Sequence, residues 1–288
     1  MNNILVTGSN GQLGSEIRKL SSNYDYTFFF TDRNSLDITY EEDIKEFIQT
    51  NNINTIINCA AYTAVDKVES DEVNADKINH LAVKSLAIIS KEKNIKLIHV
   101  STDYVFDGKN YKPYNEADET NPNGVYGKTK LDGEVAMQKV NLTNSIIIRT
   151  SWVYSSFGAN FVKTMIRLGR ERDSLGVIFD QVGTPTYARD LAKAILDIMP
   201  NIKNEKVEIY NYSNEGVLSW YDFAKEIMTM AKIDCIVNPI ETKEYPTPAS
   251  RPHYSLLNKS KIKEEFNIII PYYKDSLDEC LRRMGERK

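Results

Sequence analysis

A glycine motif near the N-terminus constrains the fold of this chain more than any other feature of its sequence. Gly8-x-x-Gly11-x-x-Gly14 follows the apolar run Ile4–Thr7, typical of a buried strand, and opens the amphipathic segment Gln12–Leu20, typical of a helix. In that context glycines let the backbone turn tightly and approach a pyrophosphate, whose charge meets the helix N-terminus. The spacing is a variant of the Gly-x-Gly-x-x-Gly form. The sequence therefore predicts a dinucleotide-binding turn.

Short apolar runs and longer amphipathic segments keep alternating through the first half of the chain. This alternation is the pattern of repeated βαβ units with a parallel sheet. The predicted strands are Tyr26–Phe30, Thr55–Asn58, Leu97–Ser101 and Ser145–Arg149, and the predicted helices are Tyr40–Thr50, Glu72–Glu92 and Val125–Lys139. We therefore expect an α/β fold, a Rossmann-type doubly wound parallel sheet, with a smaller C-terminal substrate-binding lobe.

The second half predicts that smaller lobe. After Met199-Pro200 the chain becomes richer in proline, with helix patterns at Ser219–Ala231 and Tyr273–Met284. We expect residues 1–150 to form the NAD(P)-binding core and residues 151–288 mostly the substrate-binding lobe. A strand at Leu175–Phe179 and a helix at Ala188–Met199 continue the earlier rhythm, so the segment near 175–199 is expected to return to the core.

Composition excludes several classes of partner. The net charge of −4 argues against nucleic acid. The three cysteines, Cys59, Cys235 and Cys280, are odd in number and lack metal-ligand spacing with the histidines. This usage predicts neither a disulfide framework nor a metal site, and favours a reducing, cytoplasmic location. Apolar runs are too short for a membrane span.

Residues at the second strand's end bear on the choice of cofactor. Asp32 lies eighteen positions after Gly14, where a carboxylate can bond the adenosine ribose hydroxyls and repel a 2′-phosphate. Arg33 follows directly and could attract that phosphate. Asp32 therefore favours NADH and Arg33 favours NADPH, so the sequence does not decide between the two cofactors. Asp37 and Ile38 could reach the adenine.

The third strand ends in small residues that let a cofactor approach, at the edge where open α/β sheets bind ligands. Together with the strand ends, the glycine loop and the helix near residue 126, they complete the predicted cofactor contacts. That set is Gly8, Asn10, Gly11, Gln12, Leu13, Gly14, Asp32, Arg33, Asp37, Ile38, Ala60, Ala61, Tyr62, Thr63, Val100, Tyr126 and Lys130.

Tyr126 and Lys130 are the candidate proton-handling pair. Residues four apart share one face of a helix. A free phenol titrates at about 10, and a neighbouring ammonium lowers that pKa, so the pair can handle a proton at working pH. Thr102 follows the fourth strand, where a hydroxyl can donate to a substrate carbonyl. Glycine loop, strand-end hydroxyl and Tyr/Lys pair together predict carbonyl reduction.

This combination resembles the extended short-chain dehydrogenase/reductase superfamily and, within it, the dTDP-4-dehydrorhamnose reductase family along nearly the whole chain. Glycine loop and Tyr/Lys pair are general to the superfamily, whereas Ser-Thr-Asp-Tyr-Val-Phe-Asp-Gly and Arg-Thr-Ser-Trp are more particular. The resembling segments are Gly8–Gly14, Asn58–Lys67, Val100–Gly108, Tyr126–Lys130, Arg149–Tyr154, Asp180–Thr186 and Ala249–Pro252.

The resemblance implies a role for each catalytic residue. Tyr126 is the general acid that protonates the C4 oxygen of a keto-sugar as hydride arrives from the nicotinamide. Lys130 lowers the pKa of that tyrosine and bonds the nicotinamide ribose. Thr102 takes the place usually held by serine and orients the carbonyl. The implied reaction converts dTDP-4-dehydro-β-L-rhamnose to dTDP-L-rhamnose.

Substrate contacts are expected from Thr102, Asp103, Tyr104 and Trp152, of which Trp152 without the resemblance would be read as packing. Arg251 is a candidate for the diphosphate, because its planar fork suits phosphate oxygens and a proline-rich loop would hold it. An ordinary surface ion pair is the competing interpretation for this arginine.

Two alternatives stay open. The substrate could be another nucleotide-linked 4-keto-sugar, or the chain could be a non-catalytic subunit like the accessory subunit of methionine adenosyltransferase, although the catalytic set is complete. Some relatives bind magnesium at a dimer contact through carboxylates. Glu16 could serve here, but Arg189 stands where a further acid is wanted. We therefore expect no bound metal and either a monomer or a homodimer.

Overall fold

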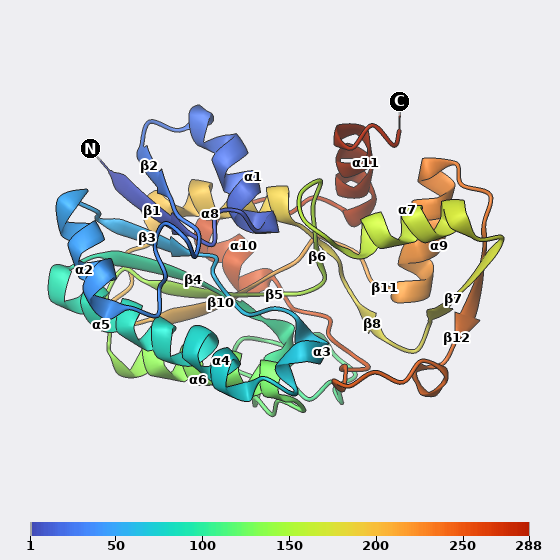
Figure 1. Ribbon diagram of the computed structural model, residues 1–288, viewed down its shortest axis with the longest axis horizontal. Helices are drawn as coiled ribbons and strands as arrows, with labels where there is room; N and C mark the ends of the chain where they lie inside the picture. Colours follow the sequence, from blue (N-terminus) through green and yellow to red (C-terminus); the bar gives the residue numbers. More distant parts are fainter. Residues whose placement is uncertain (1, 288) are drawn as a thin grey trace.

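The computed structural model describes residues 2–287 and is built on a six-stranded sheet (Figure 1). The strand order is β10-β5-β4-β3-β1-β2, and every neighbouring pair is parallel. The direction of winding reverses between β1 and β3, which is where an open α/β sheet forms its ligand crevice. These strands are β1 (Asn3–Thr7), β2 (Thr27–Phe30), β3 (Thr55–Asn58), β4 (Lys96–Thr102), β5 (Ile146–Thr150) and β10 (Glu208–Tyr212).

Helices cover both faces of this sheet because side chains alternate along each strand. In β1, Ile4 and Val6 pack into the cluster that also holds residues of α1 and α8, while Leu5 packs into the cluster under α2 and α5. Figure 1 shows the two layers on opposite sides of the strands. The helices are α1 (Gln12–Leu20) and α8 (Ala188–Ile198) on one face, and α2 (Glu41–Thr50), α5 (Ala82–Lys93) and α6 (Val125–Lys139) on the other. The Rossmann-type prediction is confirmed.

A second lobe lies beyond one end of the sheet and has a hydrophobic core of its own (Figure 1). Its strands form three two-stranded sheets, which pair β7 with β12, β8 with β11 and β6 with β9. Its elements are β6 (Val153–Tyr154), α7 (Phe161–Glu171), β7 (Ser174–Ile178), β8 (Val182–Gly183), β9 (Thr186–Tyr187), β11 (Leu218–Ser219), α9 (Trp220–Ala231), β12 (Ile236–Ile240) and α11 (Tyr273–Arg283).

The route of the chain between the lobes differs from the expectation. Of the segment near 175–199, only α8 returns to the core, whereas β7 pairs with β12 in the second lobe. Two elements that were not predicted also lie in the core: β10, which extends the sheet beside β5, and α10 (Ser260–Phe266), whose Ile262 joins the cluster of α1 and α8. The chain therefore crosses between the lobes repeatedly, which no local pattern encodes.

The predicted helix Glu72–Glu92 is divided. It comprises α4 (Glu72–Asp76), a π-helical segment over Lys77–Leu81 and then α5. Asn79 in the wider segment is buried, and its amide bonds both the N–H and the carbonyl of Tyr62 and the hydroxyl of Thr129. The widened turn thus ties the loop after β3 to α6. Within residues 2–287, no helix has the length and apolarity that a bilayer crossing requires.

Candidate active site

A cleft of about 1050 Å³ lies at the carboxyl edge of the sheet, where residues of both lobes face each other. It brings together every predicted site residue except Gly14 and Arg251. The predicted residues that line it are Gly8, Asn10, Gly11, Gln12, Leu13, Asp32, Arg33, Asp37, Ile38, Ala60, Ala61, Tyr62, Thr63, Val100, Thr102, Asp103, Tyr104, Tyr126, Lys130 and Trp152.

The glycine loop is packed so closely that its ends cannot carry side chains. Gly8 has a φ of +61°, and a Cβ there would lie 2.7 Å from the backbone nitrogen of Ala60. A Cβ on Gly14 would lie 2.5 Å from the Cα of Ser9, so Gly14 sets the contact between loop and helix rather than lining the cleft. The N-cap residue of α1, Gly11, offers no side-chain cap. The N–H groups of the first turn therefore suit an anionic group such as a pyrophosphate.

Both charged residues predicted for cofactor choice line the cleft just after β2. The carboxylate of Asp32 accepts hydrogen bonds from Asn10 Nδ2 at 2.5 Å and from the Ser35 N–H at 3.0 Å. The bonds from Ser35 lower the pKa of Asp32. Arg33 has an 85% exposed side chain, and its Nε lies 3.5 Å from Asp37. A hydrogen-bonded carboxylate and a largely exposed guanidinium thus lie next to each other at this part of the cleft.

Thr102 and Tyr126 meet because α6 packs directly on the turn after β4. A Cβ on Gly127 would lie 2.2 Å from the carbonyl oxygen of Tyr104, so only glycine permits this approach. The Tyr104 and Tyr126 rings then lie edge to face, 5.4 Å apart. Thr102 Oγ1 donates to Asp103 Oδ1 at 2.9 Å. The hydroxyl at the end of β4 and the phenol of α6 therefore converge on one point of the cleft.

The amine of Lys130 is bound to β4 rather than to the phenol. Burial raises the pKa of Tyr126, the hydrogen bond with Thr102 opposes that rise, and the Asp103 carboxylate adds to it. Lys130 Nζ instead donates to the carbonyl oxygen of Val100 at 2.7 Å. Its own pKa is lowered to about 8 by burial. The pKa of Tyr126 is thus raised, not lowered, in this structure, with burial as the largest cause.

Trp152 has a strained backbone, which argues against plain packing. Its φ is +48°, a left-handed conformation that is unfavourable for a bulky side chain. The indole lines the cleft and stacks on Trp220 with ring centroids 3.6 Å apart. A Cβ on Gly183 would come within 3.1 Å of the same ring. The second lobe therefore holds this aromatic surface in one place against the cleft.

Asp103 presents a buried carboxyl oxygen to the same region. The residue is 2% exposed, and its Oδ2 has no hydrogen-bond partner among the described residues. Burial raises the pKa of Asp103 to about 7, while the hydrogen bond from Thr102 opposes that rise. A buried polar atom of this kind is suited to a ligand hydroxyl.

Arg251 is placed differently from the prediction. Its guanidinium binds Asp66 in α3 (Val65–Val68) through two contacts, Nη2 to Oδ2 at 2.8 Å and Nη1 to Oδ1 at 3.1 Å. Nη1 also donates to the carbonyl oxygen of Ala249. Arg251 does not line the cleft. Its guanidinium N–H groups, which we expected to bind a diphosphate, instead connect the C-terminal loop to the first lobe. The competing interpretation, an ion pair, describes this structure.

Sequence reasoning missed a polar contact between the glycine loop and the second lobe. Asn160 Nδ2 donates to Gln12 Oε1 at 3.0 Å, and Gln12 Nε2 donates to the carbonyl oxygen of Val153 at 3.3 Å. Asn160 lines the cleft and caps α7, where its side chain accepts from the Lys163 N–H. An asparagine ahead of an apolar helix was the available signal, but it indicates a cap only.

Glu16, the carboxylate considered for magnesium in relatives, is paired with an arginine. The guanidinium of Arg189 lies between Glu16 and Glu279, with Nη1 3.5 Å from Glu16 Oε2 and Nε 3.1 Å from Glu279 Oε1. Glu16 is fully buried, so this cation compensates a charge that solvent cannot reach. These residues do not fit a magnesium site.

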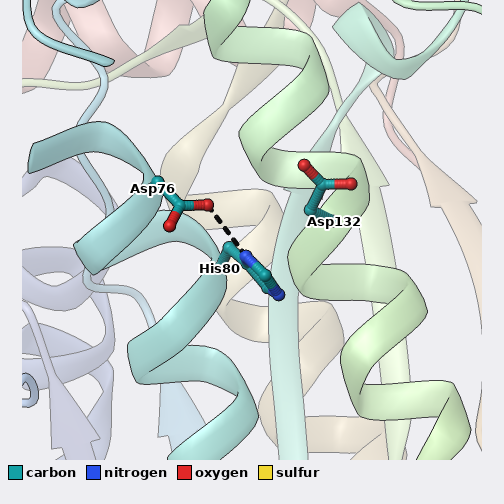
Figure 2. A group of neighbouring side chains, drawn as sticks. All are labelled: Asp76, His80 and Asp132. Carbon is teal, nitrogen blue, oxygen red and sulfur yellow. Dashed lines mark hydrogen bonds and ion pairs between the residues drawn. The ribbon is translucent and has the colours of Figure 1, made fainter. Parts of the chain in front are cut away.

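A second acidic group lies outside the cleft (Figure 2). Asp76 Oδ1 and His80 Nδ1 are 2.8 Å apart on one helical run, and Asp132 stands on α6 across from them. Their ligand atoms lie within 4.8 Å of one another. All three side chains are partly exposed, and the Asp76–His80 pair is a usual contact of residues four apart on a helix.

A parallel doubly wound sheet, a glycine-lined helix N-terminus and a Thr/Tyr/Lys set at the carboxyl edge define a dinucleotide-dependent oxidoreductase of the short-chain type. The family model described as RmlD substrate binding domain matches residues 1–286. The chain belongs to this family.

Individual relatives agree over nearly the full chain. A dTDP-4-dehydrorhamnose reductase of Aggregatibacter actinomycetemcomitans is 41% identical, with 93% of this chain and 94% of the relative covered. The crystal structure of a dTDP-4-dehydrorhamnose reductase from Clostridium acetobutylicum has a TM-score of 0.93 at 42% identity, covering 98% of this chain and 99% of the other. The same enzyme from Bacillus anthracis, solved in complex with NADP, has a TM-score of 0.93 at 35% identity and covers 98% and 100%.

Proposed function

We propose that this protein reduces the C4 keto group of dTDP-4-dehydro-β-L-rhamnose to give dTDP-L-rhamnose, with NADPH or NADH as the hydride donor. The observation that carries the proposal is the meeting of Thr102, Tyr126 and Lys130 at a cleft that begins at a dinucleotide-type glycine loop. The substrate is taken from relatives named as this reductase, which match at 41% and 37% identity.

The chain's own residues then have distinct duties. When bound, the nicotinamide supplies the hydride. Tyr126 donates its phenolic proton to the C4 oxygen, and the Thr102 hydroxyl, which bonds that phenol, orients the carbonyl. Lys130 holds the nicotinamide ribose. Burial of Tyr126 keeps the phenol protonated until oxygen develops negative charge beside it.

The cofactor contacts proposed from the sequence fit the group. The Gly8–Gly14 loop would receive the pyrophosphate, because a side chain at either end would collide with backbone. Asp32 would bond the adenosine ribose, and Arg33, with its guanidinium largely in solvent, can turn toward a 2′-phosphate. The NADP complex of the relative from Bacillus anthracis supports NADPH as a cofactor.

The second lobe would hold the deoxysugar nucleotide. We assign this contact to Asp103, Tyr104 and Trp152, which line the cleft near Tyr126. A different nucleotide-linked 4-keto-sugar is the second candidate substrate, since the same proton donor serves any such carbonyl. The complete Thr/Tyr/Lys set speaks against a purely regulatory subunit.

The test follows the absorbance of the reduced nicotinamide with the product of the preceding epimerase step as substrate. NADH and NADPH are compared at equal concentration, and UDP-linked 4-keto-sugars serve as competitors. We expect substrate-dependent oxidation that is fastest with the dTDP-linked deoxysugar. Cofactor binding without oxidation of cofactor by any keto-sugar nucleotide would instead support the regulatory role.

A further inference from the structure

A line of buried polar groups runs behind the cleft from β1 to α6. Thr7, Asn58 and His99 stand side by side on three adjacent strands, since Thr7 pairs in register with Asn58 and Asn58 with His99. Thr7 Oγ1 lies 2.6 Å from Asn58 Oδ1, Asn58 Nδ2 lies 3.1 Å from His99 Nδ1, and His99 Nε2 lies 3.3 Å from Lys130 Nζ. All four side chains are buried.

The direction of these hydrogen bonds is determined by one backbone group. The N–H of Ala60 donates to Asn58 Oδ1 at 3.2 Å and, over a longer distance of 3.4 Å, to Thr7 Oγ1. A backbone N–H can only donate, so the nearer of these two acceptors, the amide oxygen of Asn58, faces it and the amide nitrogen faces His99. His99 Nδ1 is therefore the acceptor. Burial and the nearby Lys130 hold the pKa of His99 well below its usual value, so the ring is neutral and carries its single proton on Nε2.

That proton points at Lys130. An ammonium has three donors and no lone pair, whereas a neutral amine can accept. We propose that the Asn58–His99 pair is a positioning unit that presents an Nε2–H donor to Lys130 and thereby favours the neutral amine over the ammonium. When Lys130 binds a proton, the neutral imidazole can accept from the ammonium at Nε2 only by carrying its own proton on Nδ1, and the Asn58–His99 hydrogen bond is lost.

The other groups around Lys130 do not replace this effect. Glu134, one turn further along α6, favours the ammonium, although its carboxylate is bound by Arg149 at 2.7 Å. The thiol of Cys59 at the end of β3 has its pKa raised to about 12 by burial and stays uncharged. Tyr126 stands one turn before Lys130 and is also neutral at working pH. The lowered pKa of Lys130, about 8, agrees with a site that disfavours its charge.

The consequence for turnover rests on the proposed function. A lysine that gains and loses a proton near neutral pH can restore the proton of Tyr126 after each reduction. The activity then falls as Lys130 loses its proton at high pH. Without the amide of Asn58, His99 is free to offer its Nε2 lone pair, so Lys130 keeps its proton to higher pH.

The direct test is the tautomer of His99, read from nitrogen chemical shifts of protein labelled with ¹⁵N at histidine, with no substrate needed. Only three histidines are present, so assignment by single substitution is simple. In the wild type at about pH 9.5, above the Lys130 transition, we expect the proton on Nε2. Lys130→Met keeps it there, because Asn58 still directs the ring. In Asn58→Leu we expect the His99 proton to move to Nδ1 at a pH low enough for Lys130 to be protonated. The pH at which the reduction rate falls on the alkaline side should then rise by about one unit.

Thr7→Val is the matched control. It removes the other donor to Asn58 Oδ1 but leaves the Ala60 N–H, so the tautomer stays as in the wild type. A wild-type ring that carries its proton on Nδ1 at high pH, or is doubly protonated, would overturn the proposal even if Asn58→Leu failed to fold. An unchanged pH profile in folded Asn58→Leu would do the same. Neither result depends on which sugar is reduced, whereas failure of the proposed function would leave the tautomer as expected.

Discussion

Lys130 follows Tyr126 by one turn of α6, yet its Nζ atom donates to the carbonyl oxygen of Val100 at 2.7 Å rather than to the phenol. The phenol instead has the hydroxyl of Thr102 as its hydrogen-bond partner. The proton donor and the lysine are therefore held by separate parts of β4. Their contributions should separate when each is replaced.

Tyr126→Phe removes the proton donor and keeps the ring that packs on Tyr104. We expect turnover to fall by about a hundredfold or more, with cofactor affinity near that of the wild type. Steady-state kinetics and cofactor titration measure the two effects. Tyr111→Phe is the control, since its side chain is 82% exposed. Near-full activity of Tyr126→Phe would remove this residue from the proposed role.

Lys130→Met keeps the length of the side chain but removes its amine. Cofactor affinity and turnover should both decline, because the proposed contact with the nicotinamide ribose and the support of the proton donor are lost together. Lys128→Met, on the same helix with a 62% exposed side chain, should change neither. A decline in only one of the two quantities would show that Lys130 has a single duty.

The Arg251–Asp66 pair distinguishes a diphosphate contact from a structural one. If Arg251 only ties the C-terminal loop to α3, then Arg251→Ala and Asp66→Ala should each raise KM for the sugar nucleotide by the same few-fold factor, and the double variant should add little. Direct binding of the diphosphate would make Arg251→Ala much the worse of the two. We expect equal effects, because Asp66 engages both terminal nitrogens of the guanidinium.

Arg189→Ala tests the cation between Glu16 and Glu279. Glu16 is fully buried, and loss of its counter-charge should lower the free energy of unfolding by about 3 kcal/mol in urea denaturation. Arg167→Ala removes an exposed arginine paired with Glu171 and should cost about 0.5 kcal/mol or less. A loss below about 1 kcal/mol for Arg189→Ala would mean that other contacts, such as the hydrogen bond from Ser155 Oγ, compensate Glu16.

Asp103→Asn should make stability less dependent on pH. The pKa of Asp103 is about 7 in the folded protein against 3.8 for a free aspartate carboxyl, so the folded protein binds this proton more tightly than the unfolded chain. Stability is therefore lost as pH rises from about 4 to about 7 and is level above that range. Relative to the wild type, the free energy of unfolding of Asp103→Asn should be higher by at most about 4 kcal/mol at pH 8 and unchanged near pH 3. A constant difference across this range would contradict the assignment.

The sequence by itself determined the local elements and the loop chemistry. The helices Gln12–Leu20 and Val125–Lys139 and the strand Thr55–Asn58 have the predicted bounds, because their periodicity is set by neighbouring residues. The glycine loop could also be predicted from the sequence, since glycine is needed where one backbone segment closely approaches another. The order of strand-end hydroxyl and Tyr/Lys pair also pointed to Thr102 and Tyr126, which the packing of α6 on the turn after β4 brings together.

Only the tertiary structure decided which side chains meet across long separations. Nothing local distinguishes the core strand β10 from the lobe strand β7, couples Arg251 to Asp66, or places Asn160 on Gln12. The charge state of Tyr126 and Lys130 also depends on burial and on partners from other strands. Periodicity and turn chemistry act between neighbours in sequence, whereas solvent exclusion and the pairing of buried polar groups exist only after the sheet has assembled.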